Sequence, residues 1–160
     1  MKFSRYSAVL LALPLLLSYT VFGQETKKEV KPEDTQTTHI HSAVTEKKVI
    51  TAIDADGVQR IEIAGGEYYF DPNYIVVKVN APVEFKVKKA ADSTFFIPHN
   101  IIVKAPEAGM DFNIDLKKEL ATIKFTPTKV GKYPMYCDKK PPFGKSHRDK
   151  GMEGTIEVVE

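Results

Sequence analysis

The stretch GKYPMYCDKKPPFGKSHRDKGMEGTIEVV, residues 131–159, contains two strand-like runs that are separated by a long polar loop. The runs are Tyr133 to Cys137 and Thr155 to Val159. Short runs of aromatic, β-branched and other apolar residues between turn residues are typical of β-strands. The stretch therefore predicts a strand, a loop and a second strand, with the single cysteine of the chain at the end of the first strand.

Further strand-like runs precede this stretch, from about Val49 onward. They alternate apolar and polar residues between turn residues, and they are Val58–Ile63, Tyr74–Val79, Val83–Val87, Thr94–Ile97, Ile101–Val103 and Ile123–Phe125. Alternation with a period of two, interrupted by turns about every ten residues, predicts an all-β, antiparallel Greek-key sandwich or barrel. Residues 105–120 lack the pattern, and we expect one helical turn over Leu116–Leu120.

The N-terminal part of the chain differs from the rest. Residues 1–23 contain two basic residues, an apolar run and a short polar break, which is the layout of a signal peptide cleaved before Gln24. The apolar run is short for a membrane span, so we expect no stable membrane insertion after cleavage, with an uncleaved anchor as the alternative. Residues 24–48 are polar and charged and predict a flexible tether. We therefore expect residues 49–160 to form one domain of a periplasmic or otherwise exported protein.

The charge balance and the cysteine count exclude several classes of protein. The chain has 23 Lys and Arg residues against 21 Asp and Glu, and Lys2 and Arg5 lie in the predicted signal peptide. The predicted mature chain therefore has no basic excess of the kind that nucleic-acid binding requires, and we expect a monomer without a nucleic-acid partner. One cysteine permits neither an intrachain disulfide nor a c-type haem attachment motif.

Four residues form a candidate metal site: His99, Cys137, His147 and Met152. A thiolate, two imidazoles and a thioether suit copper, and two His with one Cys and a weak axial Met make a blue-copper electron-transfer site. Each residue alone also has a structural interpretation, such as a core methionine, a buried inert cysteine or a surface histidine. A lone thiol in an exported protein is open to oxidation, which makes its role as a metal ligand worth weighing.

The chain resembles the cupredoxins, and the plastocyanin-like members in particular. The family pattern Gly-x-Tyr-x-x-Tyr-Cys, followed later by His-x-x-x-Gly-Met-x-Gly, is matched at residues 131–137 and 147–154. Pro98-His99-Asn100 matches the motif of the first ligand, and the resemblance covers roughly residues 65–160. It implies a cupredoxin-like sandwich that binds one copper ion through the four residues above. It also implies that Asn100 fixes the cysteine loop from outside the ligand set.

The spacing between Cys137 and His147 departs from the family. Nine residues intervene, whereas plastocyanin-like members have two and azurin-like members a few more. Either the longer loop extends outward and leaves the ligand set unchanged, or the site is opened to water and to chemistry. The predicted function is single-electron transfer between redox partners, without catalysis. A copper storage or delivery protein and a mononuclear copper enzyme are the two alternatives.

The long loop also suggests how a partner is recognised. It has an apolar tip, Pro141 to Phe143, within an excess of positive charge: Lys139, Lys140, Lys145, Arg148 and Lys150 against Asp138 and Asp149. An apolar tip with a basic rim predicts docking to a redox protein that has an acidic patch, with a plain solvated loop as the alternative. The pair His39 and His41 in the predicted tether is a weak candidate for copper capture.

Overall fold

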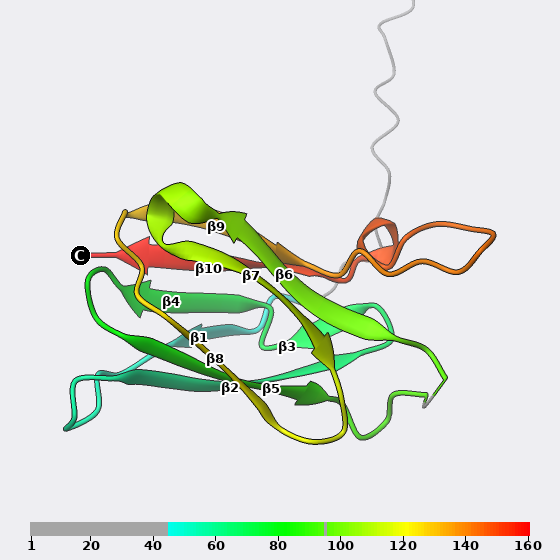
Figure 1. Cartoon of the computed structure of the whole chain (residues 1–160), viewed down its shortest axis with the longest axis horizontal. Coiled ribbons are helices and arrows are strands. Elements are labelled where there is room, and N and C mark those ends of the chain that lie inside the picture. The colour runs from blue at the N-terminus through cyan, green and yellow to red at the C-terminus, as the bar shows by residue number, and fades with distance from the viewer. Residues whose placement is uncertain (1–44, 95) are drawn as a thin grey trace, which may run out of the picture. The chain divides into compact units, whose positions relative to one another are not determined.

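The computed structural model describes residues 45–94 and 96–160, which form two packed β-sheets (Figure 1). The larger sheet has the strand order β1-β4-β10-β9-β6-β7, and the smaller has the order β3-β2-β5-β8. The strands are β1 (Lys48–Ile50), β2 (Gln59–Gly66), β3 (Tyr69–Asp71), β4 (Tyr74–Lys78), β5 (Val83–Lys89), β6 (His99–Ala105), β7 (Met110–Leu116), β8 (Ala121–Phe125), β9 (Gly131–Tyr136) and β10 (Glu153–Val159). Two single-turn 3-10 helices, η1 (Pro106–Ala108) and η2 (Arg148–Lys150), complete the described elements. This arrangement confirms the predicted all-β, cupredoxin-like sandwich.

The sheets are mixed, so the expectation of purely antiparallel pairing was wrong. Strand β4 pairs in parallel with both β1 and β10, and β2 pairs in parallel with β5. Period-two alternation indicates which face of a strand is buried but carries no information on the direction of its neighbour. Consecutive strands of this chain often lie in different sheets, which brings strands of the same direction side by side.

Strand β7 lies where no strand was expected. Its sequence MDFNIDL alternates apolar residues with Asp111, Asn113 and Asp115, and only the apolar ends Met110 and Leu116 are fully buried. Asp and Asn are disfavoured in strands, so the alternation here does not by itself predict a strand. The predicted helical turn over Leu116–Leu120 is also wrong, because Leu116 is the last residue of β7 and a bend follows it.

The start of β6 also differs from the prediction. The predicted strand over Thr94–Ile97 is absent from the described residues there, and β6 begins only at His99. Pro98 explains the boundary, since a proline lacks the N–H that a strand ladder needs.

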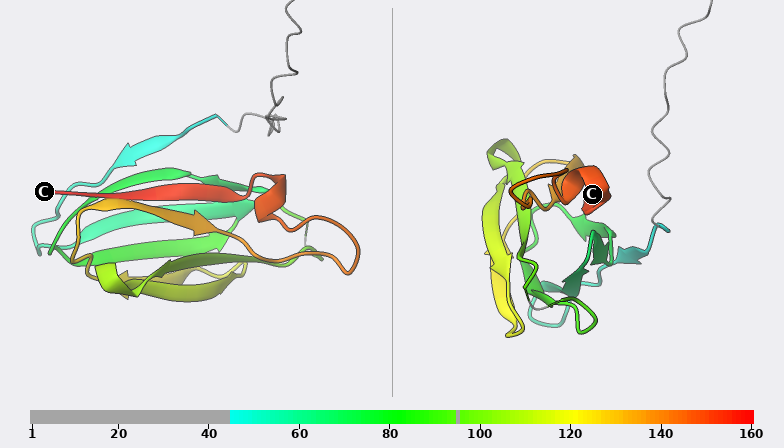
Figure 2. Two further views of the ribbon diagram at one scale, coloured as in Figure 1. Left: turned by 90° about the horizontal axis from the view of Figure 1, so that it is seen from above. Right: turned by 90° about the vertical axis from the view of Figure 1, so that its right-hand side faces the viewer.

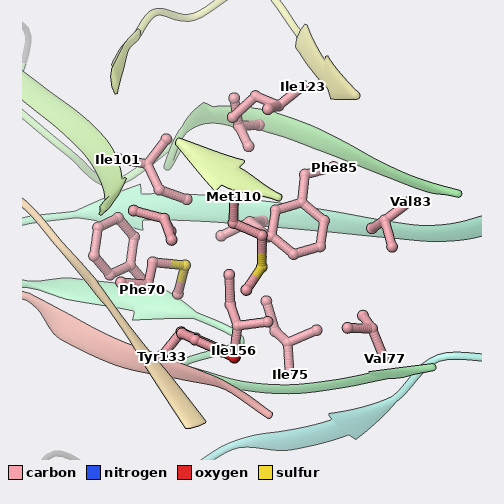
Figure 3. Packing of buried hydrophobic residues seen from close by; sticks show 14 of the residues in the cluster. Phe70, Ile75, Val77, Val83, Phe85, Ile101, Met110, Ile123, Tyr133 and Ile156 are labelled. Carbon is pink, nitrogen blue, oxygen red and sulfur yellow. The ribbon is translucent and has the colours of Figure 1, made fainter. Parts of the chain in front are cut away.

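The core lies between the two sheets. The inward-facing residues of β4 and β5 meet those of β6, β9 and β10 there (Figure 3). Phe85 is fully buried and packs edge to face on Phe125, with ring centroids 4.9 Å apart. This packing makes a rigid support for the loops at the ends of the strands.

A buried amide joins three segments of the fold. Gln59 is fully buried, and its side chain donates to the carbonyls of Lys78 and Ala81 and accepts from the Lys78 N–H and the Thr51 hydroxyl. It therefore satisfies backbone groups at the end of β4 that would otherwise lack partners.

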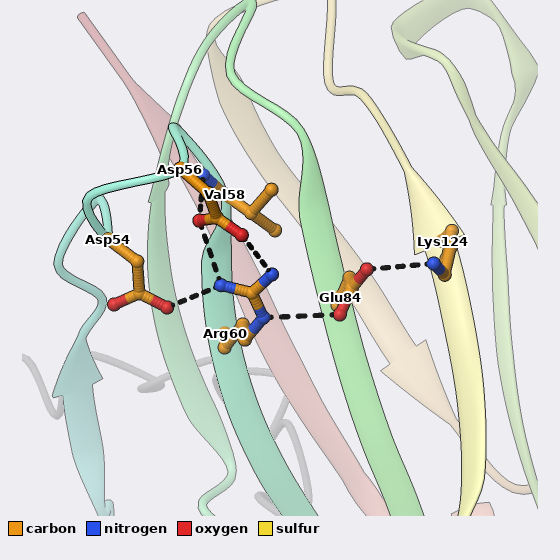
Figure 4. Close-up of polar contacts among 6 residues, drawn as sticks. All are labelled: Asp54, Asp56, Val58, Arg60, Glu84 and Lys124. Atoms are coloured by element: carbon orange, nitrogen blue, oxygen red, sulfur yellow. Dashed lines mark hydrogen bonds and ion pairs between the residues drawn. The ribbon is translucent and has the colours of Figure 1, made fainter.

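A charged network lies on the solvent side of the smaller sheet, next to this amide in sequence (Figure 4). Arg60 contacts the carboxylates of Asp54, Asp56 and Glu84, and Glu84 also pairs with Lys124. The hydrogen bond from Arg60 lowers the pKa of Asp56 to about 2. Because these groups are exposed to solvent, we expect them to contribute little to stability.

Gln59→Leu is predicted to lower the free energy of unfolding by about 1–3 kcal/mol, because it leaves a partly buried N–H and two carbonyls without their side-chain partner. The neighbouring substitution Arg60→Met serves as a control and should lower it much less. Urea unfolding of both variants measures the difference. Equal destabilisation by the two substitutions would contradict the assigned role of Gln59.

Candidate metal centre

Three of the four predicted ligands converge at one end of the sandwich. His99 is the first residue of β6, Cys137 directly follows β9, and His147 directly precedes η2. The connection between Cys137 and His147 extends beyond the strand ends at this end of the molecule, in orange in Figures 1 and 2. All three side chains are buried, and one donor atom of each lies within 4.8 Å of the others.

The donor atoms face one another. The Nδ1 atoms of His99 and His147 are 3.1 Å apart, and the Cys137 Sγ is 3.5 Å from the His147 Nδ1. Two nitrogens that each lie about 2 Å from one metal ion are themselves separated by about 3 to 3.5 Å. The spacing of the two ring nitrogens therefore fits a shared metal ion.

Backbone hydrogen bonds tie the fourth predicted residue to this cluster. The Cys137 N–H donates to the Met152 carbonyl at 3.1 Å, and the Met152 N–H donates to the His147 carbonyl at 2.9 Å. The Met152 side chain is fully buried. A β-carbon at Gly65 would lie 3.2 Å from its terminal methyl group and would clash with Leu116, so the glycine leaves room for this methionine.

The long connection is closed at its base. The His147 N–H donates to the Lys139 carbonyl at 2.8 Å, and the Arg148 N–H donates to the Cys137 carbonyl at 3.0 Å. Residues 140–146 therefore form an excursion whose two ends are held together by the backbone. The ion pair between Lys139 and Asp115 of β7, at 2.8 Å, holds the start of the excursion.

Asn100 supports the cysteine in the way that the family resemblance implies. Its backbone N–H points at the Cys137 Sγ at 3.4 Å, and its side chain exchanges two hydrogen bonds with Asp138, at 2.9 and 3.2 Å. The same side-chain NH₂ donates to Asn113 of β7 at 2.9 Å. The role of Asn113 was missed by sequence reasoning, although the alternation of β7 was the available signal.

The protonation states favour metal binding. Burial, with smaller effects of His147 and Lys89, lowers the pKa of His99 to about 4. Burial and the nearby Lys150 also lower the pKa of His147. Both imidazoles are therefore neutral at pH 7, which is the ligand form. Burial raises the pKa of the Cys137 thiol, so a metal ion that binds there displaces a proton.

The donor set itself tests which metal fits. Two neutral imidazoles and one thiolate are borderline and soft ligands, and the described part of the cluster contains no carboxylate of the kind that Mg²⁺ or Ca²⁺ requires. The Nδ1 atom of His99 is the better placed of its two ring nitrogens for a ligand, because it faces the His147 Nδ1 at 3.1 Å. The other ring nitrogen, Nε2, is buried without a hydrogen-bond partner among the described residues. Copper fits this set of residues.

A tyrosine that sequence reasoning missed contacts the site. The ring of Tyr68 packs edge to face on the His147 ring, with centroids 5.2 Å apart, and His147 is only 3% exposed. Lys150 donates to the Tyr68 hydroxyl at 3.0 Å. No sequence signal connects Tyr68 with His147, because the contact depends on how two distant loops meet.

Several predictions fall outside the described residues. The predicted signal peptide, most of the predicted tether, and His39 and His41 lie in residues 1–44, which the structure does not describe. The last residues of the predicted tether are described and are ordered against the domain. The Lys47 backbone N–H donates to the Asn73 side chain, and β1 begins at Lys48. In the described part of the chain, no helix has the length and apolar character needed to cross a membrane.

Comparisons with solved structures found proteins with a similar fold. The metal-binding domain of a Cu(I)-exporting P-type ATPase from Streptococcus pneumoniae, solved with Cu(I), is 21% identical; the match covers 72% of this chain and 99% of that domain, with a TM-score of 0.51. A chain of a heme-copper terminal oxidase dimer is 19% identical over 66% of each chain, also with a TM-score of 0.51. Auracyanin A, a "blue" copper protein from Chloroflexus aurantiacus, is 24% identical, covers 64% of this chain and all of its own, and has a TM-score of 0.46. No curated protein sequence matches.

These structural similarities concern the fold alone. The cupredoxin-like domain model, in contrast, matches residues 41–147, which is more than half of the chain and includes His99, Cys137 and His147. The chain belongs to the cupredoxin-like domain family.

Proposed function

We propose that this protein is an exported mononuclear copper protein that transfers single electrons between redox partners and is not an enzyme. The proposed ligands are His99, Cys137, His147 and Met152. The observation that carries the proposal is the buried convergence of two histidine Nδ1 atoms and the only thiol of the chain at one end of the sandwich.

Rigidity of the ligands supports electron transfer. Bound copper would supply a one-electron couple between Cu(I) and Cu(II). The chain fixes Cys137 through its own backbone and through the N–H of Asn100, and it fixes His147 through backbone bonds on both sides. Ligands held in this way keep the same positions in both oxidation states, so little of the surroundings must rearrange when an electron moves.

Burial of the ligands argues against the alternatives. A delivery protein must release copper to a partner that contacts its ligands, whereas His99, Cys137 and His147 are each 3% exposed or less. An enzyme needs a coordination position that a substrate can reach. The Tyr68 ring packs edge to face on the His147 ring, and His147 is almost fully buried.

The closed base of the loop supports an unchanged ligand set despite the long spacing. The Lys139 carbonyl and the His147 N–H meet as the first and last residues of a tight turn do. Residues 140–146 then add length outside the site, at a small cost in loop entropy.

The excursion and its surroundings fit an acidic redox partner. Phe143 is 94% exposed on the excursion, between Lys140 and Lys145. A separate hollow of about 430 Å³ at the end of β5 is lined by Lys88, Lys89 and Lys118 together with small residues of the β5–β6 loop. An exposed aromatic ring with positive charge around it favours a partner with an apolar pocket and an acidic rim.

Cys137→Ala is predicted to abolish the intense visible absorption of the Cu(II) protein, because that colour comes from charge transfer between thiolate and copper. Met152→Leu serves as the control: it should keep the colour and change the reduction potential. Visible absorption and electron paramagnetic resonance of the full mature chain measure both. Colour that survives in the Cys137 variant would refute the proposed ligand set.

Replacement of residues 140–146 by Asn-Gly is predicted to leave the copper spectrum unchanged. The two-residue turn preserves the bond between the Lys139 carbonyl and the His147 N–H. Electron paramagnetic resonance of the shortened Cu(II) protein tests this. A changed copper hyperfine splitting would mean that the excursion itself shapes the site.

The double variant Lys140→Glu/Lys145→Glu is predicted to slow electron transfer to an acidic c-type cytochrome about tenfold at low ionic strength, because it removes electrostatic steering. The difference should shrink as salt is added. Lys78→Glu/Lys129→Glu carries the same change in charge at strand ends away from the ligand loop and provides the control. Equal rates for the two double variants in stopped-flow measurements would exclude docking at the excursion.

A further inference from the structure

The turn between β2 and β3 places a bulky residue where glycine is normally found. Gly66 pairs with Tyr69, so Glu67 and Tyr68 are the two central residues of the turn. Tyr68 has a φ of 69°, in the left-handed region that a side chain of this size rarely adopts. In a turn with positive φ at its second central residue, glycine or asparagine is favoured. A tyrosine kept in this conformation indicates that its side chain has a role of its own.

That side chain lies over the metal centre. Its ring meets the His147 ring at an interplanar angle of 73°. Lys150, in η2 between His147 and Met152, donates to the Tyr68 hydroxyl and also lies 4.4 Å from the centre of its ring. Tyr68 is therefore bound both to a proposed ligand and to the segment that connects two proposed ligands.

The residues on both sides of Tyr68 fix the turn to a third loop. Glu67 accepts hydrogen bonds from the Ser93 hydroxyl, at 3.1 Å, and from the Thr94 N–H, at 2.5 Å. The Tyr69 hydroxyl donates to Asp92 at 2.7 Å. These three partners belong to the β5–β6 loop, which leads into His99. The turn thus joins the chain segments that carry both histidines.

We propose that Tyr68 is a positioning residue that covers His147, held in place by Lys150, and that it sets how fast copper and small reagents reach the buried donor atoms. This inference rests on the proposed copper centre. According to this inference, copper is retained during many cycles of electron transfer by two features. One is the set of ligands, and the other is the contact between Tyr68 and His147. The strained turn and the lysine are then explained by one role.

The first test measures loss of Cu(I) to an excess of the chelator bathocuproine disulfonate. Tyr68→Gly removes the cover and suits the backbone conformation, so we expect copper loss to be about tenfold faster. Tyr68→Phe keeps the ring and removes only its hydrogen bond with Lys150, whereas Lys150→Met keeps the ring and removes both that hydrogen bond and the cation–π contact. Each should therefore give a smaller increase than Tyr68→Gly, and the double variant should be no faster than Lys150→Met alone.

A matched control is Lys132→Met, because Lys132 also lies over a tyrosine ring, that of Tyr74, at 5.6 Å. It should leave the rate of copper loss unchanged. The inference is overturned if Tyr68→Gly loses copper at the wild-type rate. If that variant does not fold, an unchanged rate in Lys150→Met overturns it instead.

The second test uses the metal-free protein and separates this inference from the proposed function. The rate at which a disulfide reagent, 5,5′-dithiobis(2-nitrobenzoate), modifies the buried Cys137 thiol reports how often the cover opens. Tyr68→Gly should raise this modification rate about tenfold. Low concentrations of urea should leave the modification rate unchanged, because the opening is local. A rate equal to wild type, or one that follows global unfolding in urea, overturns the role of Tyr68. Absence of a copper spectrum with a raised thiol rate would reject the proposed function and retain the cover.

Discussion

The backbone pairing around Cys137 is the constraint on which the rest of the site depends. The Cys137 N–H bonds to the Met152 carbonyl, and the Met152 N–H bonds to the His147 carbonyl, so three proposed ligands form one hydrogen-bonded unit. Because β9 and β10 are antiparallel neighbours, the loop between them must return to the strand it left. The pairing of β9 with β10 therefore brings these three residues together, whatever the length of the chain that leaves and re-enters the site between Lys139 and His147.

Strand β7 extends this support to the outside of the site. Its polar face presents Asn113 to Asn100 and Asp115 to Lys139. These two contacts hold the residue that follows the first histidine and the residue where the excursion begins. The hydrogen bonds between Asn100 and Asp138 then join the two ligand segments to each other. The strand that the sequence did not reveal is thus the one that stabilises the ligand loop from the side.

How far the sequence predicts this structure depends on the range of the interactions. Strands such as β5 were predictable because alternation is local. The convergence of Cys137 with His99 and His147 was predictable because a single cysteine and two histidines form a recognisable set of candidate ligands. The parallel pairing of β2 with β5 was not predictable, since it depends on how the chain crosses between sheets. The contact between Tyr68 and His147 was not predictable either, because it joins two loops through side chains alone.

Burial of the lone thiol connects the chemistry to the proposed location of the protein. In an exported protein, an accessible thiolate is oxidised or forms wrong disulfides. Cys137 is fully buried and its pKa is raised, so without metal it remains a protonated, protected thiol. The same burial means that copper must displace a proton from a closed site in order to bind. We expect a centre built in this way to exchange metal slowly, whereas an electron needs no opening of the chain to pass. The burial of the thiol is therefore consistent with the proposed role of an electron carrier that keeps its metal.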